Sequence, residues 1–375
     1  MGVADAGCPQ CRRPPAGKVA STARYLAVDL LLDPATVLAA SQRRVLPPVT
    51  VVLDRDDDVR FTAAALAAHR PRAGTITVHP TVGTARTVVL LHDHLTALGR
   101  SVAGLRAQGL TREVQAEHAV RVWMWTEAVR HVIVLRSHLR VDLNYLLDLH
   151  TATGAALTLV WHTPTLGDDL QLLLNSLDHR VVDTLDAARE AFHHPLERCP
   201  SPGHRAPSRT CCAMDGVPAP PQSGGGAPVA GSPSSAMVDT IRRHGVHPVY
   251  AGALAAQWVT GAEVSRLRGV RLQDLAHDAA ALSLPPALCD VPGGIRSGGA
   301  YETFTVPECL RAPLLAAGHH RRLEGPGPQS RLFGALRTDA LSALARRCAL
   351  RIPEGAAPRP AGVHEDRRGT GTGSP

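Results

Sequence analysis

Aromatic residues are scarce in this sequence, and lysine occurs only once. Phenylalanine, tryptophan and tyrosine together make up 3% of the 375 residues, which argues against a binding surface of stacked aromatic rings. Lys18 is the only lysine, so the formal net charge of +7 comes from arginine. Arginine suits phosphate and carboxylate partners, but these arginines are scattered and form no long basic run. The pattern therefore favours a bias of genome composition over a nucleic-acid footprint.

Long apolar runs are also missing. No stretch approaches the roughly 20 apolar residues of a membrane-spanning helix, and residues 1–15 lack the apolar centre of a signal peptide. We therefore expect a cytoplasmic protein without a membrane partner. In that compartment the eight cysteines are expected to be thiols or metal ligands rather than disulfides.

The pattern predicts an α/β fold: a P-loop-like, three-layer parallel-sheet domain, then a flexible linker and a small, mainly α-helical domain. Over residues 74–162, short β-branched runs alternate with segments of helical periodicity, as in parallel crossover units. Strands are expected at 49–53, 75–78, 102–105, 132–135, 156–162 and 303–306. Helices are expected at 61–68, 87–98, 112–130, 141–151, 167–192, 308–317 and 338–350, and 237–284 is helical in pattern. The predicted divisions are a flexible arm (1–22), the α/β domain (23–195), the linker (196–236), the helical domain (237–352) and a disordered tail (353–375).

The linker combines a cysteine–histidine cluster with a run rich in proline, glycine and serine, which has too little apolar surface to fold. Cys199, His204, Cys211 and Cys212 follow the spacing C-x₄-H-x₆-C-C and could hold a structural zinc ion. Adjacent cysteines fit a tetrahedral site awkwardly, so a flexible segment with incidental thiols is the favoured alternative. The C-x-x-C at residues 8–11 lacks a second pair at the usual spacing and is read as part of a mobile arm.

Residues 80–87, PTVGTART, lie between a predicted strand and a predicted helix, as a phosphate-binding loop does. They fit G-x-x-x-x-G-K-[ST] with Arg86 at the lysine position and Thr87 at the metal-binding hydroxyl. Pro80 replaces the first glycine and has no N–H to donate, and Ala85 replaces the second. If nucleotide binding is retained, the ligand is ATP and the contacts are Gly83, Thr84, Ala85, Arg86 and Thr87.

The acidic residue that organises Mg²⁺ in such sites normally ends a neighbouring strand. The predicted strand 132–135 instead runs into Arg136 and Ser137. A guanidinium about 4 Å from Mg²⁺ would repel it by roughly 8 kcal/mol at an effective dielectric near 20, so ordinary Mg-ATP hydrolysis is not expected. In the alternative of an atypical ATPase site, Asp93 or Asp142 replaces the missing acid.

The other acidic and histidine-rich stretches are not predicted to be catalytic. The acidic run at 54–58 precedes a predicted helix, and we interpret it as a solvated helix start rather than a metal site. His92 and His94 fall on opposite sides of a predicted helix, and chance clusters are expected among 19 histidines.

The order of HPTVGTART, VIVLRSH and LDLHTATGAALTLVWHTP resembles the phosphate-loop, acidic-strand and sensor-strand order of AAA+ ATPases, particularly transposition-helper and initiator-like ATPases. The resemblance covers residues 60–190. Arg86, Thr87 and Thr163 match functional positions of that family. The departures are Pro80, Ala85, Arg136 and Ser137. The resemblance implies an AAA+-like fold, and the departures imply a degenerate, non-hydrolysing descendant.

Residues 260–275, TGAEVSRLRGVRLQDL, resemble the start of a tyrosine-recombinase catalytic domain. Glu263 occupies the place of the phosphate-clamping arginine, and a carboxylate there would repel the scissile phosphate, so strand cleavage is not supported. An unrelated small helical domain is the favoured interpretation, and Arg266, Arg268 and Arg271 are then a solvated helix face.

These patterns predict a non-catalytic regulatory or adaptor protein on an AAA+-like scaffold, with a protein or DNA as its partner. A nucleotide-dependent ATPase with an atypical loop is the alternative. A recombinase-related DNA-binding protein without strand-cleavage activity is the third hypothesis.

Overall fold

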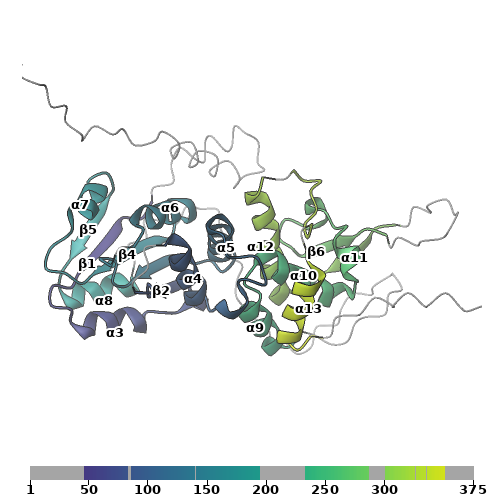
Figure 1. The fold of residues 1–375 in the computed structure, drawn as a ribbon, viewed down its shortest axis with the longest axis horizontal. Helices are drawn as coiled ribbons and strands as arrows, with labels where there is room; N and C mark the ends of the chain where they lie inside the picture. Colours follow the sequence, from purple (N-terminus) through teal and green to yellow (C-terminus); the bar gives the residue numbers. More distant parts are fainter. Residues whose placement is uncertain are drawn as a thin grey trace, which may run out of the picture.

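The computed structural model describes residues 46–82, 86–139, 141–194, 233–286, 300–325, 327–334 and 336–350. Residues 46–194 form an α/β part, and the mainly helical part that starts at residue 233 lies beside it (Figure 1). The predicted arm, the predicted tail and most of the predicted linker lie outside the described residues.

Five parallel strands form the sheet of the α/β part, which confirms the predicted α/β class and parallel sheet. They are β1 (Val49–Leu53), β2 (Thr75–Val78), β3 (His131–Val134), β4 (Ala156–Trp161) and β5 (His179–Val182), in the order β2-β3-β4-β1-β5. Every residue of β1, β3 and β4 is buried, as expected for central strands covered on both faces. β2 and β5 form the two edges.

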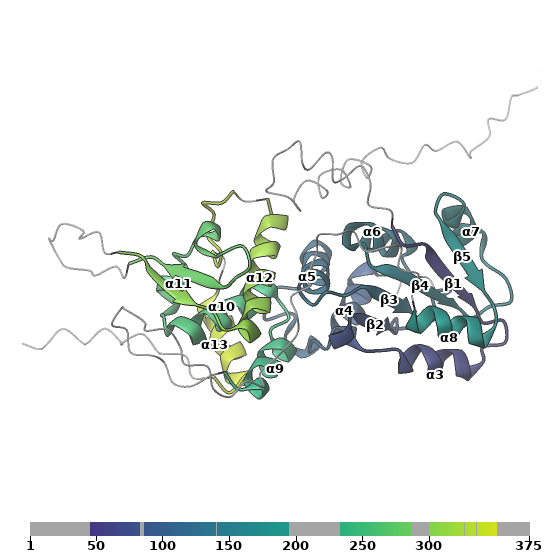
Figure 2. The same cartoon turned by 180° about the vertical axis from the view of Figure 1, so that it is seen from behind.

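Helices cover both faces of this sheet. One face packs against α3 (Val59–Ala67) and α8 (Leu185–His193) through Val52, Ile133 and Val160. The neighbouring strand residues point to the opposite face, because side chains alternate along a strand. The helices of the α/β part on that face are α4 (Thr87–Ala97), α5 (Glu113–Thr126), α6 (Leu143–Thr153) and α7 (Asp168–Leu174). Figure 2 shows the sheet between the two helix layers.

The helical part is built around α10 (Pro248–Thr260), which is buried through most of its length. α12 (Glu308–Leu323) crosses α10 so closely that a Cβ at Gly252 would lie 2.5 Å from Ala317 Cβ. The remaining elements are α9 (Ser235–His244), α11 (Val264–Leu267), α13 (Thr338–Arg347) and the antiparallel pair β6 (Ala281–Leu284) and β7 (Glu302–Thr305).

The two parts share one hydrophobic core. Both views show α5 between the sheet and α12 (Figures 1 and 2), and buried residues of both parts belong to a single cluster. Trp123 of α5 donates its indole N–H to the Val246 carbonyl at 2.6 Å. The buried Glu127 carboxylate accepts hydrogen bonds from the guanidinium groups of Arg100 and Arg242. The described residues therefore form one packed unit.

Three predicted elements were wrong. Residues 102–105 form a 3₁₀ turn, Val102–Gly104, instead of a strand. Residues 167–192 contain α7, β5 and α8 instead of one helix, because the β-branched run in β5 pairs with β1. The helical pattern of 237–284 is interrupted at Gly261, which ends α10 with φ +63°, and it finishes in strand β6. No helix in the described ranges is long and apolar enough to cross a membrane.

Candidate functional site at the carboxyl ends of the strands

The predicted phosphate loop follows β2, which is an edge strand of the sheet. Gly83, Thr84 and Ala85 lie outside the described residues. Arg86 is exposed and is the residue just before α4, and its side chain makes no capping hydrogen bond. Thr87 is the first residue of the helix. The strand–loop–helix setting that the sequence predicts is therefore present.

Carboxylates occupy the described ends of this loop. The Thr87 hydroxyl donates to Asp142 Oδ2 at 2.9 Å. On the other side of the loop, the backbone N–H and hydroxyl of Thr81 donate to the Asp93 carboxylate, each at 2.8 Å. A phosphate bound by this loop would lie near two negatively charged carboxylates. The Thr81 N–H could not donate to it, because that N–H already donates to Asp93.

The other residues carried over from the AAA+ resemblance make local contacts. Arg136, two residues after the end of β3, adopts φ +50°, and its Nε is buried without a hydrogen-bond partner among the described residues. The Ser137 hydroxyl donates to the Val134 carbonyl at 2.9 Å. The Thr163 hydroxyl donates to the Thr165 carbonyl at 2.7 Å. In the described part of the chain, these hydrogen bonds do not join Arg136, Ser137 or Thr163 to Arg86 or Thr87.

The connections of the sheet change face between β1 and β4. The crossover from β1 to β2 carries α3 on one face, and the crossover from β4 to β5 carries α7 on the other. In open parallel sheets, ligands bind outside the carboxyl ends of the strands at such a topological switch point. Asp54 directly follows β1 and His162 directly follows β4, so both residues lie at that position.

Asp54, Asp57 and His162 converge at this switch point. His162 Nδ1 lies 2.8 Å from Asp54 Oδ2 and 3.0 Å from Asp57 Oδ1. The side chains of Asp54 and His162 are 1% and 2% exposed, whereas Asp57 is 60% exposed. Asp54 is also fixed from the other side, because its Oδ1 accepts the backbone N–H of Asp58 at 2.9 Å. A buried imidazole and carboxylate thus meet a second carboxylate that faces solvent.

This arrangement corrects part of the interpretation of the acidic run. Asp58 does cap α3, since its side chain accepts the Arg60 N–H at 2.9 Å. Asp54, however, is buried rather than solvated, because β4 pairs with β1 and brings His162 against it. An acidic residue directly after the predicted strand 49–53, which is apolar except for Thr50, was the available sequence signal.

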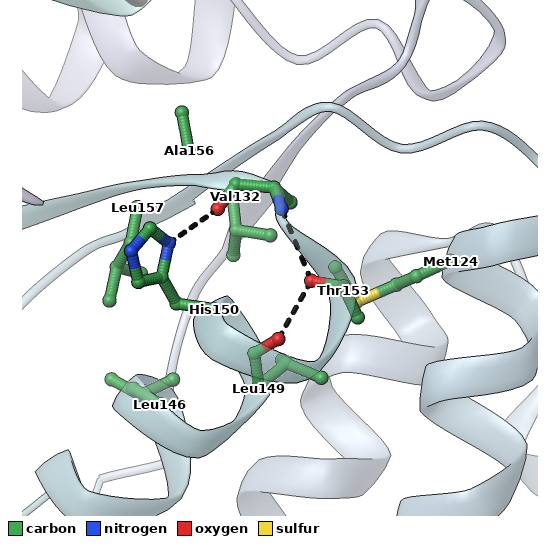
Figure 3. A pocket seen from close by; sticks show the side chains of 9 residues that line it. Met124, Val132, Leu146, Leu149, His150, Thr153, Ala156 and Leu157 are labelled. Carbon is green, nitrogen blue, oxygen red and sulfur yellow. Dashed lines mark hydrogen bonds between the residues drawn. The ribbon is translucent and has the colours of Figure 1, made fainter. Parts of the chain in front are cut away.

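The cavity in Figure 3 lies between α5, α6 and the strands β3 and β4. Its volume is about 10 Å³, which is close to the space one water molecule needs. His150 Nδ1 donates to the Ala155 carbonyl at 2.6 Å, and the Thr153 hydroxyl donates to the Leu149 carbonyl at 2.7 Å. The cavity is therefore too small for a nucleotide, and these two polar groups of its wall are paired.

The predicted zinc site falls in the predicted linker. Cys199, His204, Cys211 and Cys212 lie outside the described residues, and the structural zinc stays a prediction.

Of the three arginines in the recombinase-like segment, Arg266 and Arg268 are half-buried, whereas Arg271 is exposed as predicted for a solvated face. Arg266 donates to the Pro285 carbonyl at 2.8 Å, and Arg268 donates to the Leu336 carbonyl at 2.9 Å. Arg271 donates to Gln329 Oε1 at 2.6 Å. These hydrogen bonds hold the helical part together, which does not favour DNA contacts by these side chains.

Comparison with known proteins gives no relative for this chain: no family model, curated protein or solved structure matches it. The chemistry of the site is therefore inferred from its own residues.

Proposed function

We propose that this chain is a non-catalytic regulatory or adaptor protein built on an AAA+-like P-loop scaffold. The observation that carries the proposal is the pair of carboxylates, Asp93 and Asp142, at the described ends of the predicted phosphate loop. Two unit charges of like sign about 5 Å apart repel by roughly 3 kcal/mol at an effective dielectric near 20. Each carboxylate facing a bound phosphate thus weakens nucleotide binding, and Arg86 supplies only one opposing charge.

The packing of the two parts supports a scaffold role. α5 contributes to the core of both parts, and the charges of Arg100 and Glu127 are buried at their junction. Enzymes that hydrolyse nucleotides commonly couple the reaction to movement of loops or domains. A shared, continuous core instead favours a rigid body that presents a fixed surface. Because the three arginines of residues 260–275 bond within the fold, a protein partner is favoured over DNA.

One contact favours a second candidate function, an atypical nucleotide-dependent ATPase. P-loop enzymes hold Mg²⁺ between a hydroxyl that follows the loop and an acidic side chain. Thr87 and Asp142 supply those two groups at a separation of 2.9 Å. The adaptor role remains the better supported, because Asp142 also caps α6 through the Tyr145 N–H at 3.0 Å and so has a structural role without any metal ion.

Thermal unfolding of the full chain with and without Mg-ATP separates the two functions. A ligand at 100 times its dissociation constant stabilises a protein by about 2.7 kcal/mol. We expect millimolar Mg-ATP to leave the melting temperature unchanged. Stabilisation that disappears in Arg86→Ala and Thr87→Ala, but persists in the control Thr96→Ala on the exposed face of α4, would show nucleotide binding at the loop, overturn the adaptor proposal and favour the ATPase alternative. Stabilisation that persists in all three variants would also overturn the proposal, since it shows nucleotide binding elsewhere.

The partner class is tested by binding to random-sequence duplex DNA at two salt concentrations. A protein that neutralises several phosphates loses affinity steeply as salt rises. We expect no salt-dependent binding. Affinity that falls by tenfold or more between about 50 and 200 mM salt would replace the protein partner with DNA.

A further inference from the structure

We propose that Asp54, Asp57 and His162 form a binding site for a divalent transition-metal ion at the carboxyl ends of β1 and β4. The ligands would be His162 Nδ1 and one carboxylate oxygen from each aspartate. An imidazole nitrogen with two carboxylate oxygens suits first-row divalent ions such as Mn²⁺, Co²⁺ and Zn²⁺. The site lies after β1 and β4, whereas the predicted phosphate loop follows β2, so the inference does not depend on the adaptor function.

The donor atoms already converge. All three lie within 4.8 Å of one another, with the imidazole nitrogen 2.8 and 3.0 Å from the two carboxylate oxygens. Ligand atoms about 2.1 Å from a tetrahedral metal ion are separated by roughly 3.4 Å. A metal ion therefore needs each carboxylate oxygen to move only about half an ångström away from the imidazole nitrogen. Asp57, which is 60% exposed, provides the solvent-facing side through which an ion can enter.

The hydrogen bonds of the metal-free cluster leave two groups unsatisfied. A neutral imidazole carries one proton, so Nδ1–H cannot donate fully to both Asp54 and Asp57. Nε2 of the same ring is buried, and it has no hydrogen-bond partner among the described residues. A buried, unpaired polar atom of this kind is uncommon in native proteins. A divalent ion that replaces the Nδ1 proton would bind both carboxylates at once. Nε2 would then carry the ring proton and would still have no partner among the described residues, so the case for the ion rests on Nδ1 and the two carboxylates.

The surrounding structure fixes the two buried ligands before any ion binds. The Asp58 N–H holds the second oxygen of Asp54, and the Asp54 N–H donates to the Trp161 carbonyl of β4 at 2.9 Å. The His162 backbone N–H lies 3.3 Å from His138 Nδ1. Contacts of this kind orient metal ligands and raise affinity. Two ligands held by paired strands and a third on a solvent-exposed loop leave at least one coordination position for water or an anionic group.

Cobalt titration of the full, chelator-treated chain tests this site. Co²⁺ is chosen because thiolate ligands give a sulfur-to-metal charge-transfer absorption that nitrogen and oxygen ligands lack. The Cys199–Cys212 cluster can thus be told apart from the proposed site. We expect calorimetry to show one equivalent bound with visible d–d absorption and no charge-transfer band. A second equivalent with that band belongs to the cysteines and is removed by substituting Cys199, Cys211 and Cys212 with alanine.

Variants then assign the ligands. We expect Asp57→Asn and His162→Gln each to weaken cobalt binding by on the order of tenfold or more, because the loss of a residue that only supports a ligand already has an effect of about that size. Asp56→Asn is the matched control, because Asp56 is an exposed neighbour outside the cluster, and it should bind as the parent does. Asp57 is exposed, so its variant keeps the test valid if His162→Gln does not fold.

Several results would overturn the inference. They are the absence of binding, binding only with the thiolate band, unchanged affinity in Asp57→Asn, and equal loss in Asp56→Asn. Equal loss in Asp56→Asn would mean that Co²⁺ is bound by the general negative charge of residues 54–58 and not by three specific ligands. Because no nucleotide is present, failure here leaves the test of the adaptor function unaffected.

Discussion

Removing the negative charge of Glu127 should loosen the junction between the two parts of the molecule. Glu127 follows α5 and is buried, and it pairs with the buried Arg100 and with Arg242 of α9. The Arg100 guanidinium also lies 3.5 Å from the centre of the Trp123 ring. In Glu127→Gln, two guanidinium groups lose their counter-ion while Arg100 stays buried.

The expected loss is several kilocalories per mole. Removing one partner of a buried ion pair typically costs about 3–5 kcal/mol, because the other charge is left without compensation. The cation–π contact with Trp123 stabilises the desolvated Arg100 by about 2 kcal/mol. Hydrogen bonds from the glutamine side chain recover a part of the loss. We therefore expect Glu127→Gln to lower the free energy of unfolding by about 3 kcal/mol.

Urea unfolding followed by tryptophan fluorescence measures this effect. Trp123 reports on the junction because its indole donates to the Val246 carbonyl. The matched control is Arg72→Gln, which breaks a pair with Asp239 that also joins the two parts but is largely exposed. Exposed pairs contribute less than about 1 kcal/mol. If Glu127→Gln and Arg72→Gln lower the unfolding free energy equally, the buried network does not hold the junction.

Two further predictions concern packing and acid stability. Gly252→Ala should destabilise the helical part by about 1–3 kcal/mol, because the new methyl group overlaps Ala317 where α10 crosses α12. Gly327→Ala, which has open space, should be neutral in the same urea assay; equal effects would contradict this account. Burial lowers the pKa of both His94 and His131 from 6.5 to about 4. As the pH falls, these histidines become protonated in the unfolded chain before they do so in the folded protein. The stability that the two neutral histidines contribute to the fold is therefore complete above pH 6.5 and is lost between pH 6.5 and 4. Each histidine should lower the free energy of unfolding by roughly 3 kcal/mol by pH 4. A urea midpoint that stays constant from pH 7.5 to 4.5 would refute the lowered pKa of these two histidines.

Local patterns in the sequence predicted individual strands well. β1 and β2 have the predicted bounds, because short β-branched runs between turn residues carry their own signal. The order of the strands carries no local signal, since it depends on which face each crossover helix takes. Local patterns thus predict a loop after β2 but do not show that β2 is an edge strand, whereas β1 and β4 lie inside the sheet.

The candidate metal site was missed for the same reason. Asp54 and His162 are 108 residues apart, and their contact exists only because β4 pairs with β1. The sequence could show only that each residue follows an apolar run. Thr87 and Asp142 are a similar case, since the contact between them comes from α4 and α6 packing on the same face of the sheet.

The continuous core across α5 determines how the chain can be divided in the laboratory. A fragment that ends at residue 194 would expose the side of α5 that otherwise packs on α12, including the Trp123 indole and the Arg100–Glu127 pair. A fragment that starts at residue 233 would expose the matching surface of α10 and α12. Each half is therefore a poor candidate for separate expression, but the two surfaces are complementary. We therefore expect the two halves, co-expressed as separate chains, to reassemble as a split protein through the core that they share.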